Sequence, residues 1–162
     1  MNDNALNLLK FLDTNRLVDF EVIGNDSEEG LINRIKTQKF VYLAQKCFGI
    51  ESGYDYNIYR YGPYSPALAE DYFNLDVKMM RSLLDYSLPN FDANKFLRIV
   101  NDKNEEWLEV ATTLLDVSSE IKDNQALIEQ VSGIKTMFPK TYIEKTYNDL
   151  IQFSLLNSVN YF

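Results

Sequence analysis

The stretch Leu31–Phe48, with the sequence LINRIKTQKFVYLAQKCF, decides the fold class of this chain. It contains no glycine or proline, and its apolar residues would cover most of the circumference of a helix. Gly49, of the residue type that commonly ends helices, follows directly, and Ser27 precedes the stretch as a candidate N-cap. We therefore expect one long helix over residues 31–48 and, with it, a mainly α fold.

Further helices are expected on both sides of this one, because apolar residues recur there at helical spacing. Several begin at recognisable caps, such as Ser65 before Pro66, Asp76, and Asn104. The expected ranges are 4–12, 66–75, 77–86, 91–100, 105–121, 124–135 and 139–156. The last three form a consecutive three-helix unit, which could be the core of a helix-turn-helix or winged helix.

A short extended segment or small sheet is expected near residues 54–61, whose sequence is YDYNIYRY. Aromatic residues favour strands, and the segment is too short and irregular to be a helix. Gly62 and Pro63 are expected to form a turn after it. The whole chain is then expected to be one compact multi-helix domain over residues 1–162, with candidate subdomains at 1–100 and 104–162.

The composition excludes several classes of function. The chain has 162 residues with one cysteine and no histidine. The commonest zinc and non-haem iron sites, and the Ser-His-Asp and Cys-His mechanisms, therefore cannot be built, and we expect no metal site and no cofactor. The single cysteine, Cys47, favours a reducing compartment, and we expect it to be a buried apolar residue rather than a reactive thiol.

The distribution of charge and hydropathy bears on the partners. The N-terminus lacks the pattern of a signal peptide, and no stretch approaches the roughly 20 apolar residues of a membrane span. A cytoplasmic protein without membrane contact is therefore expected. The net charge is −8 and the pI about 4.6, which suits a basic protein partner better than the phosphates of a nucleic acid.

Lys36 and Lys39 form the first candidate site, because they lie on a helix whose circumference is mostly apolar. Residues 31–48 are the one basic stretch of any size in this acidic chain and contain no acidic residue. Two interpretations are open. The lysine stems pack while their ammonium groups reach water, or the ammonium groups bind carboxylates or helix-end carbonyls at a functional surface.

The segment from residue 59 to residue 66, YRYGPYSP, is the second candidate site. Its prolines stiffen the chain, its glycine allows a sharp turn, and tyrosine and arginine are typical interface anchors. The candidate partner-binding residues here are Tyr59, Arg60, Tyr61, Gly62, Pro63 and Tyr64. The alternative is that the segment docks the strand onto the next helix and that its rings fill the core.

These two segments carry a family resemblance. Lys36–Gln45, KTQKFVYLAQ, followed some twenty residues later by Tyr61-Gly62-Pro63, resembles the core of the Panacea domain, the SocA-like antitoxin group. The fuller string YGPYSPAL at residues 61–68 is also similar to the uncharacterised YwgA-type proteins of bacteria and archaea. The resemblance covers residues 30–75 well and residues 107–156 less specifically.

The Panacea resemblance implies a mostly helical fold and a role as an antitoxin or proteolytic adaptor that acts by protein contact. It implies no enzymatic activity. One departure is Tyr64, which stands where Panacea domains often have valine.

Three functions follow for testing. The first, which we expect, is a regulatory or protein-interaction module that binds a protein partner through the Lys36/Lys39 helix and the loop at residues 59–66; its oligomeric state is open, a homodimer included. The second is a winged-helix DNA-binding regulator, although the last helix carries no net positive charge. The third is an enzyme in which Glu70 or Asp71 faces one of the two lysines. The chain is not expected to be an enzyme.

Overall fold

The computed structural model describes residues 1–157, which form eight α-helices and one two-stranded antiparallel sheet. In chain order the elements are α1 (Asp3–Thr14), α2 (Glu28–Phe48), β1 (Asn57–Tyr59), β2 (Gly62–Tyr64), α3 (Pro66–Phe73), α4 (Val77–Ser82), α5 (Ala93–Val100), α6 (Glu105–Val117), α7 (Asn124–Ile134) and α8 (Lys140–Gln152). The expectation of a mainly α fold with a small sheet near residues 54–61 is confirmed.

Helix α2 is the central element, and Ser27 and Gly49 cap it as predicted, although it begins at Glu28 rather than at Leu31. The Ser27 hydroxyl accepts a hydrogen bond from the Gly30 N–H at 3.1 Å, which caps the first turn. Gly49 ends the helix in the left-handed conformation, with φ of 71°, and its N–H donates to the Ala44 carbonyl. Most of the helix between these ends is buried, because other elements pack around it.

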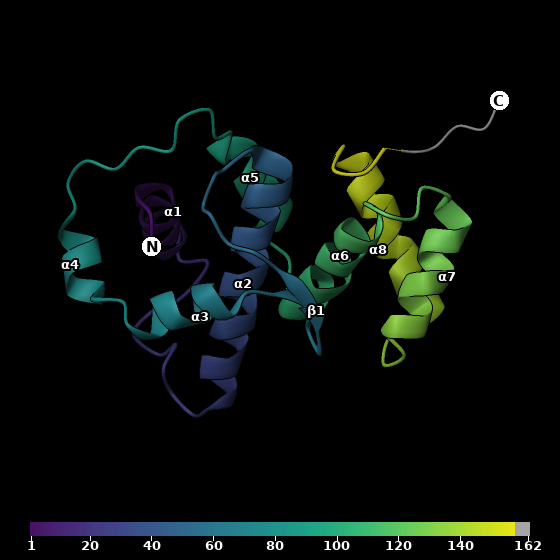
Figure 1. Ribbon diagram of the computed structural model, residues 1–162, viewed down its shortest axis with the longest axis horizontal. Coiled ribbons are helices and arrows are strands. Elements are labelled where there is room, and N and C mark those ends of the chain that lie inside the picture. The colour runs from purple at the N-terminus through teal and green to yellow at the C-terminus, as the bar shows by residue number, and fades with distance from the viewer. Residues whose placement is uncertain (158–162) are drawn as a thin grey trace.

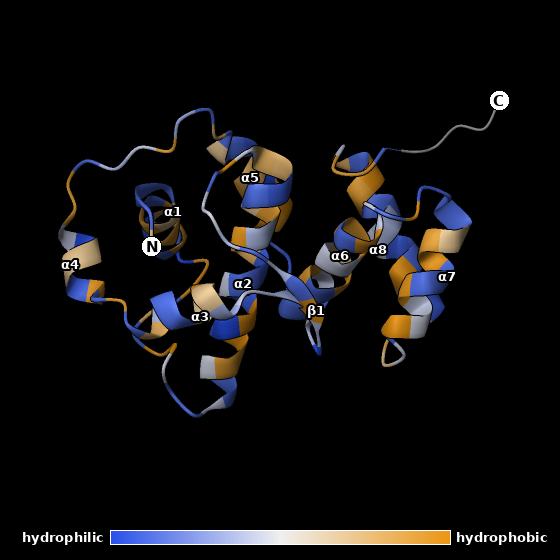
Figure 2. Ribbon diagram, viewed as in Figure 1, coloured by the Kyte–Doolittle hydropathy of each residue, from blue (hydrophilic) through white to orange (hydrophobic). Residues whose placement is uncertain are grey.

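Most of the remaining helices lie in two groups, one on each side of α2, and α5 packs beside the C-terminal half of α2 (Figure 1). Helices α1, α3 and α4 lie on one side, whereas α6, α7 and α8 pack against one another on the other side. The hairpin β1–β2 lies between the groups and contacts both α2 and α6. Hydrophobic and hydrophilic residues alternate along the helices, as expected where each helix has one buried side (Figure 2).

The core is continuous across both groups. Phe40 and Leu43 of α2 and Leu108 and Leu114 of α6 are at most 1% exposed and belong to one hydrophobic cluster. Apolar burial of this kind stabilises by roughly 25 cal/mol per Å². The hairpin therefore packs against well-buried helices on both of its sides, α2 and α6.

The predicted turn at Gly62 and Pro63 is wrong, because both residues belong to β2. Tyr59 pairs with Gly62, so the two residues between them, Arg60 and Tyr61, form the turn. Two-residue loops are the commonest connections in hairpins.

Several helices end earlier than predicted. The helix expected to reach residue 86 ends at Ser82, after which Leu84 is 94% exposed and finds no core to pack against. Helix α6 stops at Val117 rather than residue 121, where the Ser118 and Ser119 hydroxyls bond to carbonyls of the last turn. The final helix ends at Gln152, and Ser154 follows with φ of 58°.

Candidate functional site

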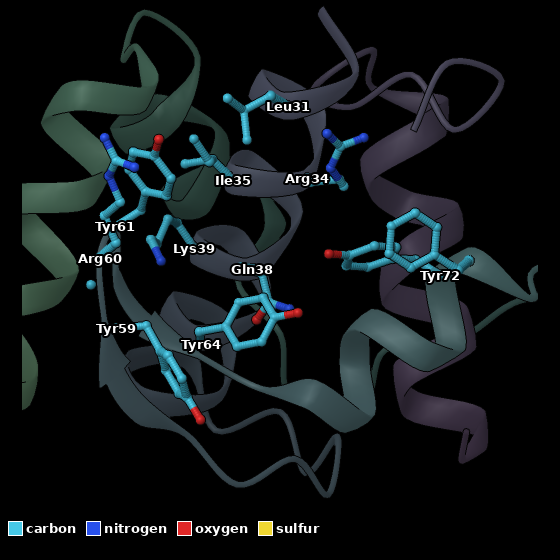
Figure 3. A pocket seen from close by; sticks show the side chains of 12 residues that line it. Leu31, Arg34, Ile35, Gln38, Lys39, Tyr59, Arg60, Tyr61, Tyr64 and Tyr72 are labelled. Carbon is cyan, nitrogen blue, oxygen red and sulfur yellow. The ribbon is translucent and has the colours of Figure 1, made fainter. Parts of the chain in front are cut away.

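A cavity of about 390 Å³ opens between α2, the hairpin and the C-terminal end of α3. Its wall is mainly aromatic and aliphatic (Figure 3). The lining residues are Leu31, Arg34, Ile35, Gln38, Lys39, Tyr59, Arg60, Tyr61, Gly62, Tyr64, Tyr72 and Phe73. A volume of this size is typical of ligand or anchor-residue pockets in proteins.

Helix α2 supplies one side of the cavity through residues three and four positions apart. Leu31, Ile35 and Lys39 follow one another at four-residue spacing, so they lie on one face of the helix. In Figure 3 the Ile35 and Lys39 side chains lie between Tyr61 on one side and Tyr72 on the other. The helical spacing of α2 therefore brings its residues to the same cavity as the hairpin.

Gln38 fixes the end of the hairpin through a reciprocal pair of hydrogen bonds. Its amide nitrogen donates to the Ser65 carbonyl at 2.9 Å, and the Ser65 N–H donates back to its amide oxygen at 2.9 Å. Both residues are at most 1% exposed. Buried backbone groups need hydrogen-bond partners, and no further strand of the described chain lies beside Ser65 to supply them. The side-chain amide of Gln38 supplies these hydrogen bonds instead.

Lys39 is the most deeply buried cation of the site. The side chain is 1% exposed, and its ammonium group donates to the Pro63 carbonyl at 2.6 Å. The pKa of Lys39 is lowered to about 7, mainly by burial and in addition by the nearby Lys135, while Glu109 partly offsets both effects. Lys39 therefore differs from both interpretations: its ammonium group does not reach water, and its acceptor is a strand carbonyl rather than a carboxylate or a helix-end carbonyl.

A second buried lysine holds the other side of the hairpin turn. Lys135, at the C-terminal end of α7, donates to the Arg60 carbonyl at 2.8 Å and forms an ion pair with Glu109 of α6 at 2.7 Å. The side chains of the pair are 4% and 12% exposed, so water screens them little. Two lysines from opposite sides of the molecule therefore bind carbonyls of one hairpin.

Gly62 allows the hairpin to approach α6 closely. Its φ is +90°, a conformation that favours glycine. A Cβ atom at this position would lie 2.8 Å from the Thr113 hydroxyl oxygen and 3.3 Å from the Glu109 carbonyl oxygen. The glycine is therefore required both by the backbone and by the space beside α6.

The rim of the cavity exposes large apolar side chains. Tyr59 is 52% exposed, Phe73 55% and Leu31 36%. The Tyr59 ring packs edge-on against Tyr64, with ring centroids 5.3 Å apart, which restricts its movement. Deeper in the site Tyr72 is 3% exposed, and burial raises its pKa to about 12.

The charged residues that line the cavity are all basic. They are Arg34, Lys39 and Arg60. The Arg34 guanidinium donates to the Ile23 and Asn25 carbonyls, and Arg60 stacks on the Tyr61 ring at 5.4 Å. Neither arginine forms an ion pair with another residue of the described chain, 1–157. The site is therefore positively charged in a chain of net charge −8.

Most of the residues predicted for the site meet at this cavity. Lys39 and five hairpin residues line it, namely Tyr59, Arg60, Tyr61, Gly62 and Tyr64, while Pro63 accepts the Lys39 hydrogen bond. Lys36 does not line it: three positions before Lys39, it lies about 60° farther around the helix, outside the arc of α2 that faces the cavity. Lys36 is half-buried and has no hydrogen bond or ion pair within residues 1–157.

Within the part of the chain that the structure describes, neither acidic residue expected near the lysines lines the cavity or pairs with a lysine. Asp71 accepts a hydrogen bond from the Tyr54 hydroxyl at 2.7 Å and lies 3.4 Å from the N-terminal amino group. Glu70 is exposed. The carboxylate that acts on Lys39 is instead that of Glu109, which comes from α6.

Sequence reasoning missed several residues of the site. Those from α2 and α3 are Leu31, Arg34, Ile35, Gln38, Tyr72 and Phe73, and those behind the hairpin are Lys135 and Glu109. Leu31 and Ile35 could have been predicted from the sequence, because they precede Lys39 at four-residue spacing and therefore share its face of the helix. No local pattern connects Lys135 to Arg60, which lie 75 positions apart.

Other features of the described chain do not add a chemical centre. Within residues 1–157, no cluster of three or more metal-binding side chains occurs, and no helix has the length and hydropathy to cross a membrane. Cys47 packs against the core, and burial raises its pKa to about 11, so the thiol stays protonated and unreactive at neutral pH.

Comparisons with protein-family models, with curated proteins and with solved structures found no match for this chain. The function must therefore be argued from the site itself.

Proposed function

We propose that the chain is a protein-interaction module, and that the cavity between α2, the hairpin and α3 receives an apolar side chain of a protein partner. The observation that carries this proposal is the cavity of about 390 Å³ with exposed Leu31, Tyr59 and Phe73 at its rim. Contiguous exposed apolar surface around a pocket is typical of interaction sites, in which aromatic residues and arginine contribute most of the binding energy.

The rigid support of the hairpin favours the same function. Lys39 and Lys135 each bind a carbonyl of the hairpin, and Gln38 pairs with the residue that follows it. The tyrosines of the hairpin are therefore held in place before a partner arrives. Because less conformational entropy is lost on binding, a pre-ordered site gains affinity.

The resemblance to Panacea and YwgA-type proteins is part of this proposal. It rests on the strings at residues 36–45 and 61–68, which supply Gln38, Lys39, Tyr61, Gly62 and Tyr64 of the cavity. An antitoxin-like or adaptor-like role in the cytoplasm would use the site as a contact surface for the partner. The proposal assigns no catalytic step to the chain.

The two alternatives have less support. For DNA binding, α8 would have to present positive charge, but Lys140 at its start forms an ion pair with Glu129, and α6 begins with Glu105 and Glu106. For catalysis by an amine, Lys39 would have to reach a substrate, but it is 1% exposed and already bound to the hairpin.

Affinity capture with matched variants tests the proposal. The tagged wild-type chain, Phe73→Asp and Leu84→Asp would each be incubated with lysate of the source cells, and retained proteins quantified by mass spectrometry. Leu84 is the control because it is 94% exposed and lies outside the cavity.

We expect one or a few proteins to be retained by the wild type and by Leu84→Asp and to be reduced at least about tenfold on Phe73→Asp, because a buried charge disfavours an apolar contact. Equal retention by all three chains, or no retained protein, would contradict the proposal.

A further inference from the structure

We propose that the bound segment of the partner is a linear peptide that carries an acidic residue between two apolar residues. This inference rests on the proposed function and adds the chemistry of the partner. Its basis is a second cavity on the other side of the hairpin turn, together with the charge of the residue that separates the two cavities.

The second cavity has a volume of about 280 Å³ and lies between the hairpin turn and the end of α7. It is lined by Tyr59, Arg60, Glu109, Ile134, Lys135, Thr136, Met137 and Phe138. Met137 is 91% exposed and Ile134 38% exposed, so this cavity also has apolar side chains at its rim. In Figure 1 the hairpin and the loop after α7 reach the same edge of the molecule.

Tyr59 and Arg60 line both cavities and therefore form the ridge between them. The backbone of this ridge is held in place, because the Lys135 side chain donates to the Arg60 carbonyl at 2.8 Å. A peptide that crosses the hairpin turn can place one apolar side chain near Phe73 and another near Met137. The residue between these two anchors must then pass over Tyr59 and Arg60.

The charge at the ridge is positive and lacks a carboxylate partner. Arg60 is exposed, and its guanidinium forms no ion pair with any of the residues 1–157. Glu109, the one acidic residue lining either cavity, is paired with Lys135 at 2.7 Å. Arginine binds carboxylates well because its planar fork offers parallel donors. Charge complementarity therefore places an acidic side chain of the partner at Arg60.

Peptide selection against three versions of the full chain tests the inference. A phage library of random linear peptides would be selected on immobilised wild type, Arg60→Glu and Arg98→Glu. Arg98 is the matched control, because it is an exposed arginine on α5 that lines neither cavity. The Arg60 guanidinium only stacks on Tyr61, so its replacement leaves the hairpin carbonyl bonds in place.

We expect the wild type and Arg98→Glu to enrich peptides with Asp or Glu between two apolar residues. Arg60→Glu should instead enrich Lys or Arg at the middle position. A synthetic peptide from the wild-type selection should bind Arg60→Glu at least about tenfold more weakly, because like charges then face each other.

The other outcomes separate this inference from the proposed function. Two outcomes would overturn this inference: selection of apolar peptides without an acidic residue, or selection of the same acidic peptides by Arg60→Glu. If those peptides no longer bind Phe73→Asp, the proposed function still stands. Peptides that bind Phe73→Asp as well as the wild type, or no enrichment on any version, overturn both proposals.

Discussion

Lys39 is the residue whose surroundings depart most from those of an ordinary lysine. Its ammonium group is enclosed by the hairpin and α6, with the Pro63 carbonyl as its hydrogen-bond acceptor and Lys135 as a repelling neighbour. An isolated charge is costly to bury, and Glu109 offsets only part of that cost because it is already paired with Lys135. Folding therefore shifts the balance from the ammonium toward the neutral amine, which predominates only above about pH 7.

This preference predicts a dependence of stability on pH. The pKa of Lys39 is lowered from 10.5 to about 7 by folding, so from about pH 7 upward the unfolded state binds more protons than the folded state. The free energy of unfolding of the wild type should therefore rise relative to Lys39→Met between pH 7 and pH 9, by up to about 1.4 kcal/mol per pH unit. Urea denaturation of both proteins at each pH measures this difference.

The range stops at pH 9 because burial also raises the pKa of Tyr42, Tyr54 and Tyr56. A raised tyrosine pKa reduces the stability of both proteins above about pH 10, so the comparison is made below that pH. A constant difference between wild type and Lys39→Met from pH 7 to pH 9 would show that Lys39 stays charged in the folded chain.

Gly62 gives a second prediction at the residue scale. Gly62→Ala should destabilise the fold by about 1–3 kcal/mol, because its φ is +90° and the added Cβ would lie 2.8 Å from the Thr113 hydroxyl oxygen. Gly24→Ala is the control, since a Cβ at Gly24 meets nothing within 4 Å. Thermal and urea unfolding should separate the two variants; equal effects would mean that the hairpin does not pack closely on α6.

At the scale of elements, the hairpin is held by side chains from helices on both sides rather than by a larger sheet. It has two strands of three residues each, and a hairpin of this size has little stability of its own in water. Gln38, Lys39 and Lys135 supply the partners for its backbone. The shape of both cavities therefore depends on these three side chains.

The contribution of Gln38 can be measured directly. Gln38→Ala leaves the buried Ser65 N–H without a partner, while the Ser65 carbonyl still accepts from the Ala69 N–H at 3.1 Å. We therefore expect a loss of about 1–3 kcal/mol of stability. The amide of Ser65 should also exchange its hydrogen much faster. Gln125→Ala, which removes an exposed hydrogen bond to Glu129, should change stability by less than about 0.5 kcal/mol. Unchanged exchange at Ser65 would contradict the pairing.

Sequence patterns predicted the elements better than their contacts. Capping residues such as Ser27, Gly49 and Ser65 act locally, so the helices that they bound could be placed from the sequence. The turn of the hairpin was misplaced by two residues, because Gly62 is required for its positive φ at the start of β2 rather than within the turn. That choice depends on α6, which lies far along the chain.

The candidate site was predicted in part for the same reason. Lys39 and Tyr59 stand out locally as a cation on an apolar helix and a tyrosine in a stiff loop. Their meeting, and the contribution of Phe73, follow from how α2, the hairpin and α3 pack together. Lys36 was grouped with Lys39 because both lie on a mostly apolar helix, although the rotation of about 60° between them places Lys36 outside the cavity.

At the scale of the whole molecule, the hairpin joins two groups of helices and carries a cavity on each side of its turn. Exposed apolar residues follow one another across this edge, from Phe73 through Tyr59 to Met137. The positive Arg60 lies between the two cavities, in a chain whose net charge is −8. Such an arrangement favours a partner that is acidic at the point of contact but apolar on either side.

Site-specific photocrosslinking in the source cells tests the central claim most directly, because it captures a bound protein of any identity. A photoreactive phenylalanine analogue would replace Phe73 at the cavity rim or Leu84 on the exposed loop after α4. We predict a discrete crosslinked protein from position 73 and none from position 84. No adduct at position 73, or the same adducts at both positions, would contradict a partner-binding site in this cavity.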